Sequence, residues 1–152
     1  MITYRQATTA DSAEVVSLLA EIMQHHGVAV PDASSLDSVV RSALDSAYHS
    51  FLLAQDGEVV VGMCALVFTY STWSAALVCE LQDVVVREES RRTSVGRGLL
   101  LAAEEVARLR GCARLFLLAE SWNLAAQAFY RSLDLSEKTC LYFERDLGGG
   151  LT

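Results

Sequence analysis

The chain has 152 residues, of which 12 are Lys or Arg and 19 are Asp or Glu, so its formal net charge is −7. This size predicts one domain with a substantial core, and the acidic balance argues against a nucleic-acid partner while suiting a cationic small substrate. The longest apolar runs fall far short of the roughly 20 residues of a membrane span, and the first residues lack a signal-peptide core, so we expect a cytoplasmic protein with no membrane partner.

The first half of the chain alternates between strand and helix patterns. We expect a strand at 2–6, followed by Thr8 to Asp11, which supplies capping residues for a helix with apolar side chains at helical spacing. A second helix follows, capped by Ser34 or Ser35. Residues 51–68 then predict a β-hairpin, and a further strand extends over 77–86.

The second half alternates more regularly. Residues 95–110 predict a helix that ends at Gly111, a suitable glycine cap. A strand at 114–119, a helix at 123–131 and a last strand at 138–145 complete the pattern. Continuous apolar runs indicate strands buried on both faces, so the predicted fold class is a mixed α/β sheet with helices on both faces. We expect a single domain over 1–147 and a flexible tail over 148–152.

The four cysteines are single residues inside apolar segments, without the paired spacing of a zinc or redox motif. We therefore expect reduced, buried thiols and no metal site. The cysteines are Cys64, Cys79, Cys112 and Cys140.

A basic turn of small residues joins the strand that ends at Val86 to the next helix. A tight loop lets backbone N–H groups face a phosphate, and the first turn of the helix adds free donors and the positive end of its dipole. Arginines can pair with phosphate oxygens through two hydrogen bonds. This predicted anion site contains Arg91, Arg92, Thr93, Ser94, Val95, Gly96 and Arg97.

The same turn resembles the pyrophosphate motif of the GNAT superfamily of acetyl-CoA-dependent N-acetyltransferases, Q/R-x-x-G-x-G/A. Arg91 takes the first position and Gly96 the last, whereas Ser94 stands at the first glycine, where its hydroxyl can donate to a phosphate. The surrounding order of strands and helices agrees over some hundred residues of the family pattern.

Three further segments carry the resemblance. Residues 122–133 resemble the W-N-x-x-A-x-x-F-Y-x-x-L-G-F segment, with Asp134 where glycine is usual. Residues 81–86 resemble the L-E-D-x-x-V strand of the diamine and polyamine acetyltransferase branch, and residues 68–73 resemble the aromatic segment before it. The resemblance implies a mostly antiparallel sheet of six to seven strands, in which a splayed pair of strands binds acetyl-CoA.

The resemblance also implies which residues bind the cofactor. The pantetheine amides would pair with the open edge of the strand at 84–86, and Asn123 would add a side-chain contact, although Asn123 can equally cap a helix. The implied cofactor-binding residues are those of the anion site together with Val84, Val85, Val86, Asn123 and Tyr130.

Acetyl transfer requires a neutral amine, whereas an alkylammonium with a pKa near 10.4 is almost fully protonated at neutral pH. A carboxylate should therefore remove a proton. The branch has a glutamate at the position of Gln82, which cannot act as a base, and Glu80 points to the same face of the strand. We expect Glu80 to act through water and Gln82 to hydrogen-bond substrate or water. Alternatively, Glu80 forms a structural ion pair with an arginine.

Tyr130 is the candidate for the leaving-group end, because the family picture places its hydroxyl near the CoA sulfur, where it can donate a proton to the thiolate. A core tyrosine with a satisfied hydroxyl is the alternative. The expected substrate-binding residues are Tyr70, Trp73, Glu80, Gln82 and Asp83.

These features predict an acetyltransferase that acts on a primary amine of a small polycationic substrate of diamine or polyamine type by direct attack. An aminoglycoside is the nearest alternative acceptor. A non-catalytic acyl-CoA-binding module is the alternative from another class, since Gln82 and Ser94 depart from the family pattern. We further expect a homodimer.

Overall fold

The computed structural model describes residues 1–149. Two compact units make up the chain, Met1–Leu118 and Ala119–Thr152. The first unit contains the whole β-sheet and three of the helices, and the second contains the last helix. The single domain over 1–147 remains a prediction, and residues 150–152 of the expected flexible tail lie outside the described part.

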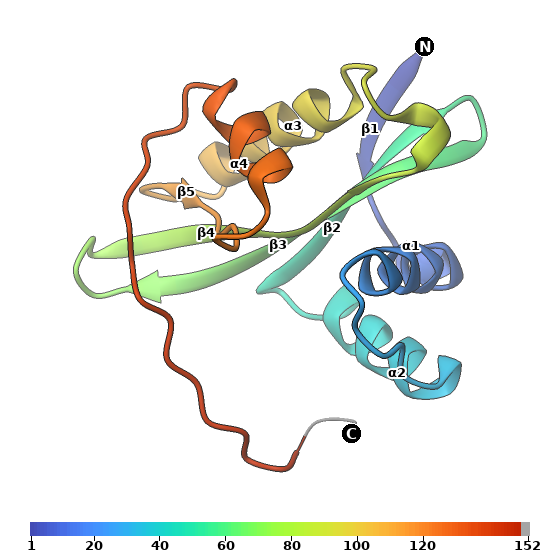
Figure 1. Ribbon diagram of the computed structural model, residues 1–152, viewed down its shortest axis with the longest axis horizontal. Helices are drawn as coiled ribbons and strands as arrows, with labels where there is room; N and C mark the ends of the chain where they lie inside the picture. Colours follow the sequence, from blue (N-terminus) through green and yellow to red (C-terminus); the bar gives the residue numbers. More distant parts are fainter. Residues whose placement is uncertain (150–152) are drawn as a thin grey trace. The chain divides into compact units, whose positions relative to one another are not determined.

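The first unit is built on a five-stranded sheet in the order β1 (Ile2–Gln6), β2 (His49–Asp56), β3 (Val59–Ser71), β4 (Ala76–Val86) and β5 (Leu115–Phe116). Strands β1 to β4 are antiparallel neighbours, and β5 runs parallel to β4. The mixed, mostly antiparallel α/β fold is thus confirmed (Figure 1).

The expected number of strands was too high. Only two residues of the predicted strand at 114–119 pair with a neighbour, and the predicted strand at 138–145 pairs with none among the described residues. Its large side chains are exposed, including Leu141, Tyr142 and Phe143. A segment with a β-like sequence forms a strand only where a neighbouring strand pairs with its backbone N–H and C=O groups. The local sequence does not indicate whether such a neighbour is present.

The helices are α1 (Ser12–His25), α2 (Ala33–Leu44), α3 (Val95–Leu109) and α4 (Leu124–Arg131). Apolar side chains of α1 and α2 pack with Phe51, Ala65 and Val85 in one core cluster, so these helices cover one face of the sheet, called here the α1/α2 face. Helix α3 covers the opposite face, called here the α3 face (Figure 1). Among the described residues, no helix is long and apolar enough to cross a membrane.

Helix α2 is capped by Asp32 and not, as expected, by Ser34 or Ser35. The Asp32 carboxylate accepts the backbone N–H of Ser35 at 3.0 Å and the hydroxyl groups of both serines. A carboxylate at the N-cap also interacts with the positive end of the helix dipole, which a serine hydroxyl does less well.

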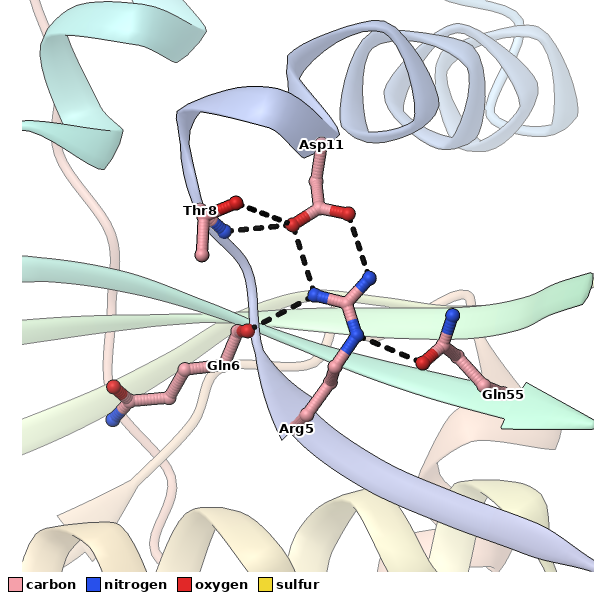
Figure 2. A network of polar contacts seen from close by, with 5 residues as sticks. All are labelled: Arg5, Gln6, Thr8, Asp11 and Gln55. Carbon is pink, nitrogen blue, oxygen red and sulfur yellow. Dashed lines mark hydrogen bonds and ion pairs between the residues drawn. The ribbon is translucent and has the colours of Figure 1, made fainter. Parts of the chain in front are cut away.

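A charged network ties β1 to the start of α1 (Figure 2). The Arg5 guanidinium donates two parallel hydrogen bonds to the Asp11 carboxylate, at 2.6 and 2.9 Å, and its Nε donates to Gln55 Oε1 at 2.8 Å. Asp11 also accepts the backbone N–H of Thr8 at 2.7 Å. The hydrogen bonds from Arg5 hold the pKa of the Asp11 carboxyl well below its usual range.

We predict that Asp11→Asn destabilises the protein by about 1–2 kcal/mol at pH 7, because a partly exposed charged pair is lost. Since folding lowers the pKa of Asp11, its contribution is complete above the pKa of the unfolded chain and declines as the pH falls below about 4. Urea unfolding of both proteins at pH 7 and pH 3 measures this difference, and an equal difference at both values would contradict the prediction.

Helix α3 lies close to β1 because residue 98 is glycine. A Cβ atom built at Gly98 would lie 1.8 Å from the Tyr4 hydroxyl oxygen and 2.1 Å from Tyr4 Cζ. A larger residue therefore requires the Tyr4 ring to move away from the helix. Gly98 is thus what allows the first turns of α3 to approach the sheet.

We predict that Gly98→Ala lowers stability by roughly 1–3 kcal/mol, since overpacking outweighs the better helix propensity of alanine. In a Tyr4→Val background the same change should become stabilising, because the ring is gone. Thermal unfolding of the two single variants and the double variant measures both effects. Equal effects of Gly98→Ala in the two backgrounds would rule out the contact with Tyr4 as the cause.

Candidate functional site

Strand β4 has an open edge in its second half. It pairs with β5 only at Cys79 with Leu115 and at Glu80 with Phe116, and the two parallel strands separate beyond that point. On its other side, β4 stays paired with β3 as far as Val86. Within the described residues, the outer edge of β4 at 81–86 therefore faces no strand and can pair with the amide groups of a ligand.

The basic loop leads from this open edge to the first turn of α3. Arg91, Arg92 and Arg97 are exposed, and none forms an ion pair with a carboxylate in the described part of the chain. Ser94 is the N-cap residue of α3, and no side chain caps the helix there. Arg91 donates from its Nε to the carbonyl oxygen of Val86 at 3.0 Å. The free N–H groups of the first turn and the three exposed guanidinium groups together suit a phosphate.

The loop backbone does not need glycine at position 94. Ser94 has φ −25°, whereas the left-handed residue of the loop is Arg92, with φ 60°. Serine therefore stands at the first glycine of the motif without left-handed backbone strain.

Glu80 and Gln82 lie on the α1/α2 face of β4. The strand register places Glu80 beside Val67 on β3, and Val67 beside His49 on β2, so these three side chains form one row across the sheet. Gln82 lies beside Ala65, which belongs to the core under α1 and α2. The uncovered end of this face therefore carries polar side chains of β2 and β4.

A β-bulge in β4 lies directly after Gln82. Ala65 pairs with Gln82 while Met63 pairs with Val85, so two residues of β4, Asp83 and Val84, lie opposite one residue of β3. Asp83 has φ 50°, a left-handed conformation that aspartate tolerates better than most residues. The bulge interrupts the alternation of side chains just where the open edge begins.

Three titratable groups lie within electrostatic reach of the Asp83 carboxyl. It interacts electrostatically with Glu80, with His49 and with His26 at the end of α1, all on the α1/α2 side of the sheet. Asp83 is exposed as a residue, but protein atoms crowd its carboxyl, and the loss of hydration raises its pKa. Glu80 adds to this rise, and the two histidines oppose it.

Among the described residues, neither Glu80 nor Asp83 is paired with an arginine or lysine, and the basic groups near Asp83 are His49 and His26. In the part of the chain that the structure describes, no ion pair or side-chain hydrogen bond involves either carboxylate. The alternative in which an arginine pairs with Glu80 therefore has no counterpart here. Unpaired carboxylates on one face attract a cation.

The aromatic residues expected at the substrate site lie elsewhere on the first unit. Tyr70 falls on the α3 face by register, where its ring contacts Tyr48 at a centroid distance of 6.1 Å. Trp73 lies in the turn between β3 and β4 and is fully exposed. The structure therefore groups Gln82, Glu80 and Asp83 but leaves these two aromatic residues apart from them.

The second unit contains the remaining predicted site residues. Asn123 caps α4, with its side-chain oxygen accepting the N–H of Ala126 at 3.2 Å. Tyr130 lies on α4 with its ring 5.2 Å from that of Phe129. The helix-capping interpretation of Asn123 is thus confirmed, while its contact with a cofactor remains a prediction.

The sequence analysis missed His49. Its ring stacks on Phe51 at a centroid distance of 4.9 Å, and its Nε2 atom is buried without a hydrogen-bond partner among the described residues. Burial lowers the pKa of His49. Only the pairing of β2 with β3 and of β3 with β4 brings this histidine into line with Glu80, so no local motif could have indicated it.

Comparison with known proteins identifies relatives over most of the chain. The model of the acetyltransferase (GNAT) family matches residues 15–134. A thialysine N-epsilon-acetyltransferase from Bos taurus is 27% identical over 164 residues, covering 95% of this chain and 96% of the relative. An aminoalkylphosphonate N-acetyltransferase from Salmonella typhimurium is 31% identical over 126 residues, covering 83% of this chain and 79% of the relative.

Solved structures share the fold. An aminoglycoside acetyltransferase from an uncultured soil metagenomic sample superposes with a TM-score of 0.83 at 18% identity, covering 96% of each chain. An identity this low supports the fold alone.

Proposed function

Because the chain belongs to the acetyltransferase (GNAT) family, whose members use acetyl-CoA as acyl donor, we propose that it acetylates a primary amine of a small polycationic substrate. A diamine or polyamine is the acceptor class that we favour. The observation that carries this choice is the pair of carboxylates, Glu80 and Asp83, neither of which forms an ion pair with an arginine or lysine among the described residues. Two such groups suit a substrate with more than one ammonium group.

The residues present fit acetyl-CoA. The open edge of β4 at Val84, Val85 and Val86 would supply backbone groups for the pantetheine amides, although the Val86 carbonyl oxygen already accepts a hydrogen bond from Arg91. The loop from Arg91 to Arg97 has donors for the pyrophosphate. Asn123 of the second unit is a further proposed contact. Acetyl-CoA supplies an acetyl thioester, whose carbonyl carbon accepts the amine and whose sulfur leaves.

On the acceptor side, Glu80 would bind an ammonium group and Gln82 would accept from or donate to the substrate or a water molecule. Both side chains project from the same face of β4. The edge and the face of one strand thus serve the two reactants, so the strand itself brings the amine close to the thioester.

An aminoglycoside is the alternative acceptor, since it also presents several ammonium groups, and one of the similar structures bears that name. The named acceptors of the relatives, thialysine and aminoalkylphosphonate, are primary amines that carry an anionic group as well. The non-catalytic acyl-CoA-binding module is tested by the same assay.

The decisive experiment incubates the protein with acetyl-CoA and a panel of amines, namely spermidine, putrescine, kanamycin, thialysine and an aminoalkylphosphonate. Release of free CoA thiol measures turnover, and mass spectrometry identifies the acetylated product. We expect the highest kcat/KM with a diamine or polyamine. Highest kcat/KM with kanamycin would favour the alternative acceptor, and tight CoA binding without release from any amine would favour the binding module.

We predict that Arg97→Gln weakens CoA binding about tenfold, or about 1.4 kcal/mol, because a charged contact to phosphate is lost. The salt dependence of binding should decrease as well. Isothermal titration calorimetry with CoA at two salt concentrations measures both. Arg108→Gln is the matched control, since Arg108 lies on the same helix but pairs with Glu104 at 3.0 Å. An equal loss in both variants would argue against a specific phosphate contact.

Tyr130 is the proposed proton donor to the departing thiolate. Tyr130→Phe removes the hydroxyl and keeps the ring, so we predict a fall in kcat of roughly 100-fold with little change in CoA affinity. Stopped-flow measurement of CoA release under saturating substrates tests this role. Unchanged turnover would exclude Tyr130 from the chemistry.

We also propose a homodimer, supported by the fully exposed Trp73 and the exposed Tyr70 near the end of the β3–β4 hairpin. Aromatic side chains are enriched at such interfaces. Light scattering coupled to size exclusion gives the mass in solution, and a mass of one chain would contradict this proposal. A cytoplasmic location likewise remains a prediction.

A further inference from the structure

The acceptor ammonium must lose a proton, and the position of the branch glutamate is occupied by Gln82, which cannot take it. Two carboxylates remain on the α1/α2 face of β4. Glu80 lies in regular strand, two residues before Gln82, beside Val67. Asp83 lies in the β-bulge, immediately beside Gln82 and at the start of the open edge.

We propose that Asp83, and not Glu80, is the carboxylate that accepts the proton from the acceptor ammonium. This inference rests on the proposed function, since it names the base of that reaction. The sequence favours Glu80 because regular alternation places it with Gln82 on one face. Asp83 follows Gln82 at the bulge, where regular alternation ends, and it interacts electrostatically with Glu80, His49 and His26 on that side.

The position of Asp83 suits a base better than that of Glu80. The edge of β4 that can receive the acyl donor begins after Glu80, so Asp83 lies along the part of the strand where the acetyl group would lie. Glu80 stands at the last paired position, where β5 still covers that edge.

The backbone at Asp83 supports a functional constraint. Its φ of 50° is sparsely populated for residues other than glycine, and such residues cluster at functional sites. Glycine or asparagine would meet the conformation with less strain, but neither offers a carboxylate.

The surroundings of Asp83 adjust its basicity. Crowding by protein atoms raises the pKa of the carboxyl, Glu80 on the same strand raises it further, and His49 on β2 and His26 at the end of α1 lower it. A higher pKa makes a carboxylate a stronger base, provided that it stays ionised at the working pH.

In the proposed step, one proton moves from the substrate ammonium group to the Asp83 carboxylate. One N–H bond of the ammonium breaks, its electron pair stays on nitrogen, and an O–H bond forms on the Asp83 carboxylate. The nitrogen lone pair would then form the bond to the acetyl carbon as the C–S electron pair leaves on sulfur. The nitrogen loses its second proton to water as the amide forms, and the thiolate takes up one proton, for which Tyr130 is the proposed donor. Asp83 afterwards releases its proton to solvent. Glu80 keeps its charge throughout and holds a second ammonium group of the substrate.

The test compares Asp83→Asn with Glu80→Gln. Asparagine matches the shape of aspartate and accepts the left-handed backbone, so the fold should be kept. Asp83→Asn should lower kcat about 100-fold or more and remove the acid limb of the pH profile of kcat/KM. Glu80→Gln should raise KM for the amine and keep the acid limb of the pH profile of kcat/KM. The limb should move to lower pH in this variant, because Glu80 raises the pKa of Asp83. If the acid limb disappears in Glu80→Gln but remains in Asp83→Asn, the proposal is overturned.

An acceptor series separates a base from a structural residue. Primary alkylamines with electron-withdrawing substituents lose their proton more readily, so they need a base less. The deficit of Asp83→Asn relative to wild type should shrink as the amine pKa falls. A deficit that stays constant across the series would overturn the role of Asp83. Asp134→Asn is the matched control for the substitution itself, since Asp134 also has a left-handed backbone, with φ 58°.

A measurement without acetyl-CoA completes the test. Carboxyl carbon NMR of the protein alone gives the pKa of Asp83, which must coincide with the acid limb of kcat/KM, because that profile reports groups of the free enzyme. A limb at another pH would overturn the proposal. Wild-type protein that acetylates no amine would overturn the proposed function and this inference together, whereas active wild type with equally active Asp83→Asn overturns only the inference.

Discussion

The register shift between β3 and β4 is the constraint on which the site depends. Without it, β4 would alternate evenly, and Asp83 would project to the α3 face among the apolar residues under that helix. The extra residue ends the regular alternation at the start of the open edge, where Asp83 interacts electrostatically with Glu80, His49 and His26. A β-bulge next to an active site is a recurrent way to redirect one side chain without disturbing the rest of the sheet.

Strand β4 gives the two reactants different surfaces. Its backbone edge beyond Glu80 is free for an elongated ligand, while its α1/α2 face carries the carboxylates. The charges are separated in the same way, because the exposed arginines Arg91, Arg92 and Arg97 follow the strand, in the loop and the first turn of α3. An acidic chain can therefore bind a polyanionic donor locally and still attract a cationic acceptor, since at physiological salt each charge acts over only about 8 Å.

Much of this arrangement follows from local patterns in the sequence. The helical spacing of apolar residues predicts α1, α2 and α3, and period-two alternation puts Glu80 and Gln82 on one face. The rest depends on pairing between distant segments. The bulge arises from the pairing of β3 with β4, and His49 lies on a third strand, β2. The sequence of residues 138–145 is typical of a strand, yet no neighbouring strand pairs with this segment among the described residues.

Gln82 illustrates how a departure from the family pattern fits its surroundings. A glutamate at this position would lie between Glu80 and Asp83, and three carboxylates that close together would raise one another's pKa values. A glutamine keeps the hydrogen-bonding capacity and removes one charge, so fewer carboxylates compete for the proton. In the proposed mechanism, the base therefore lies one residue further along β4, at Asp83 in the bulge.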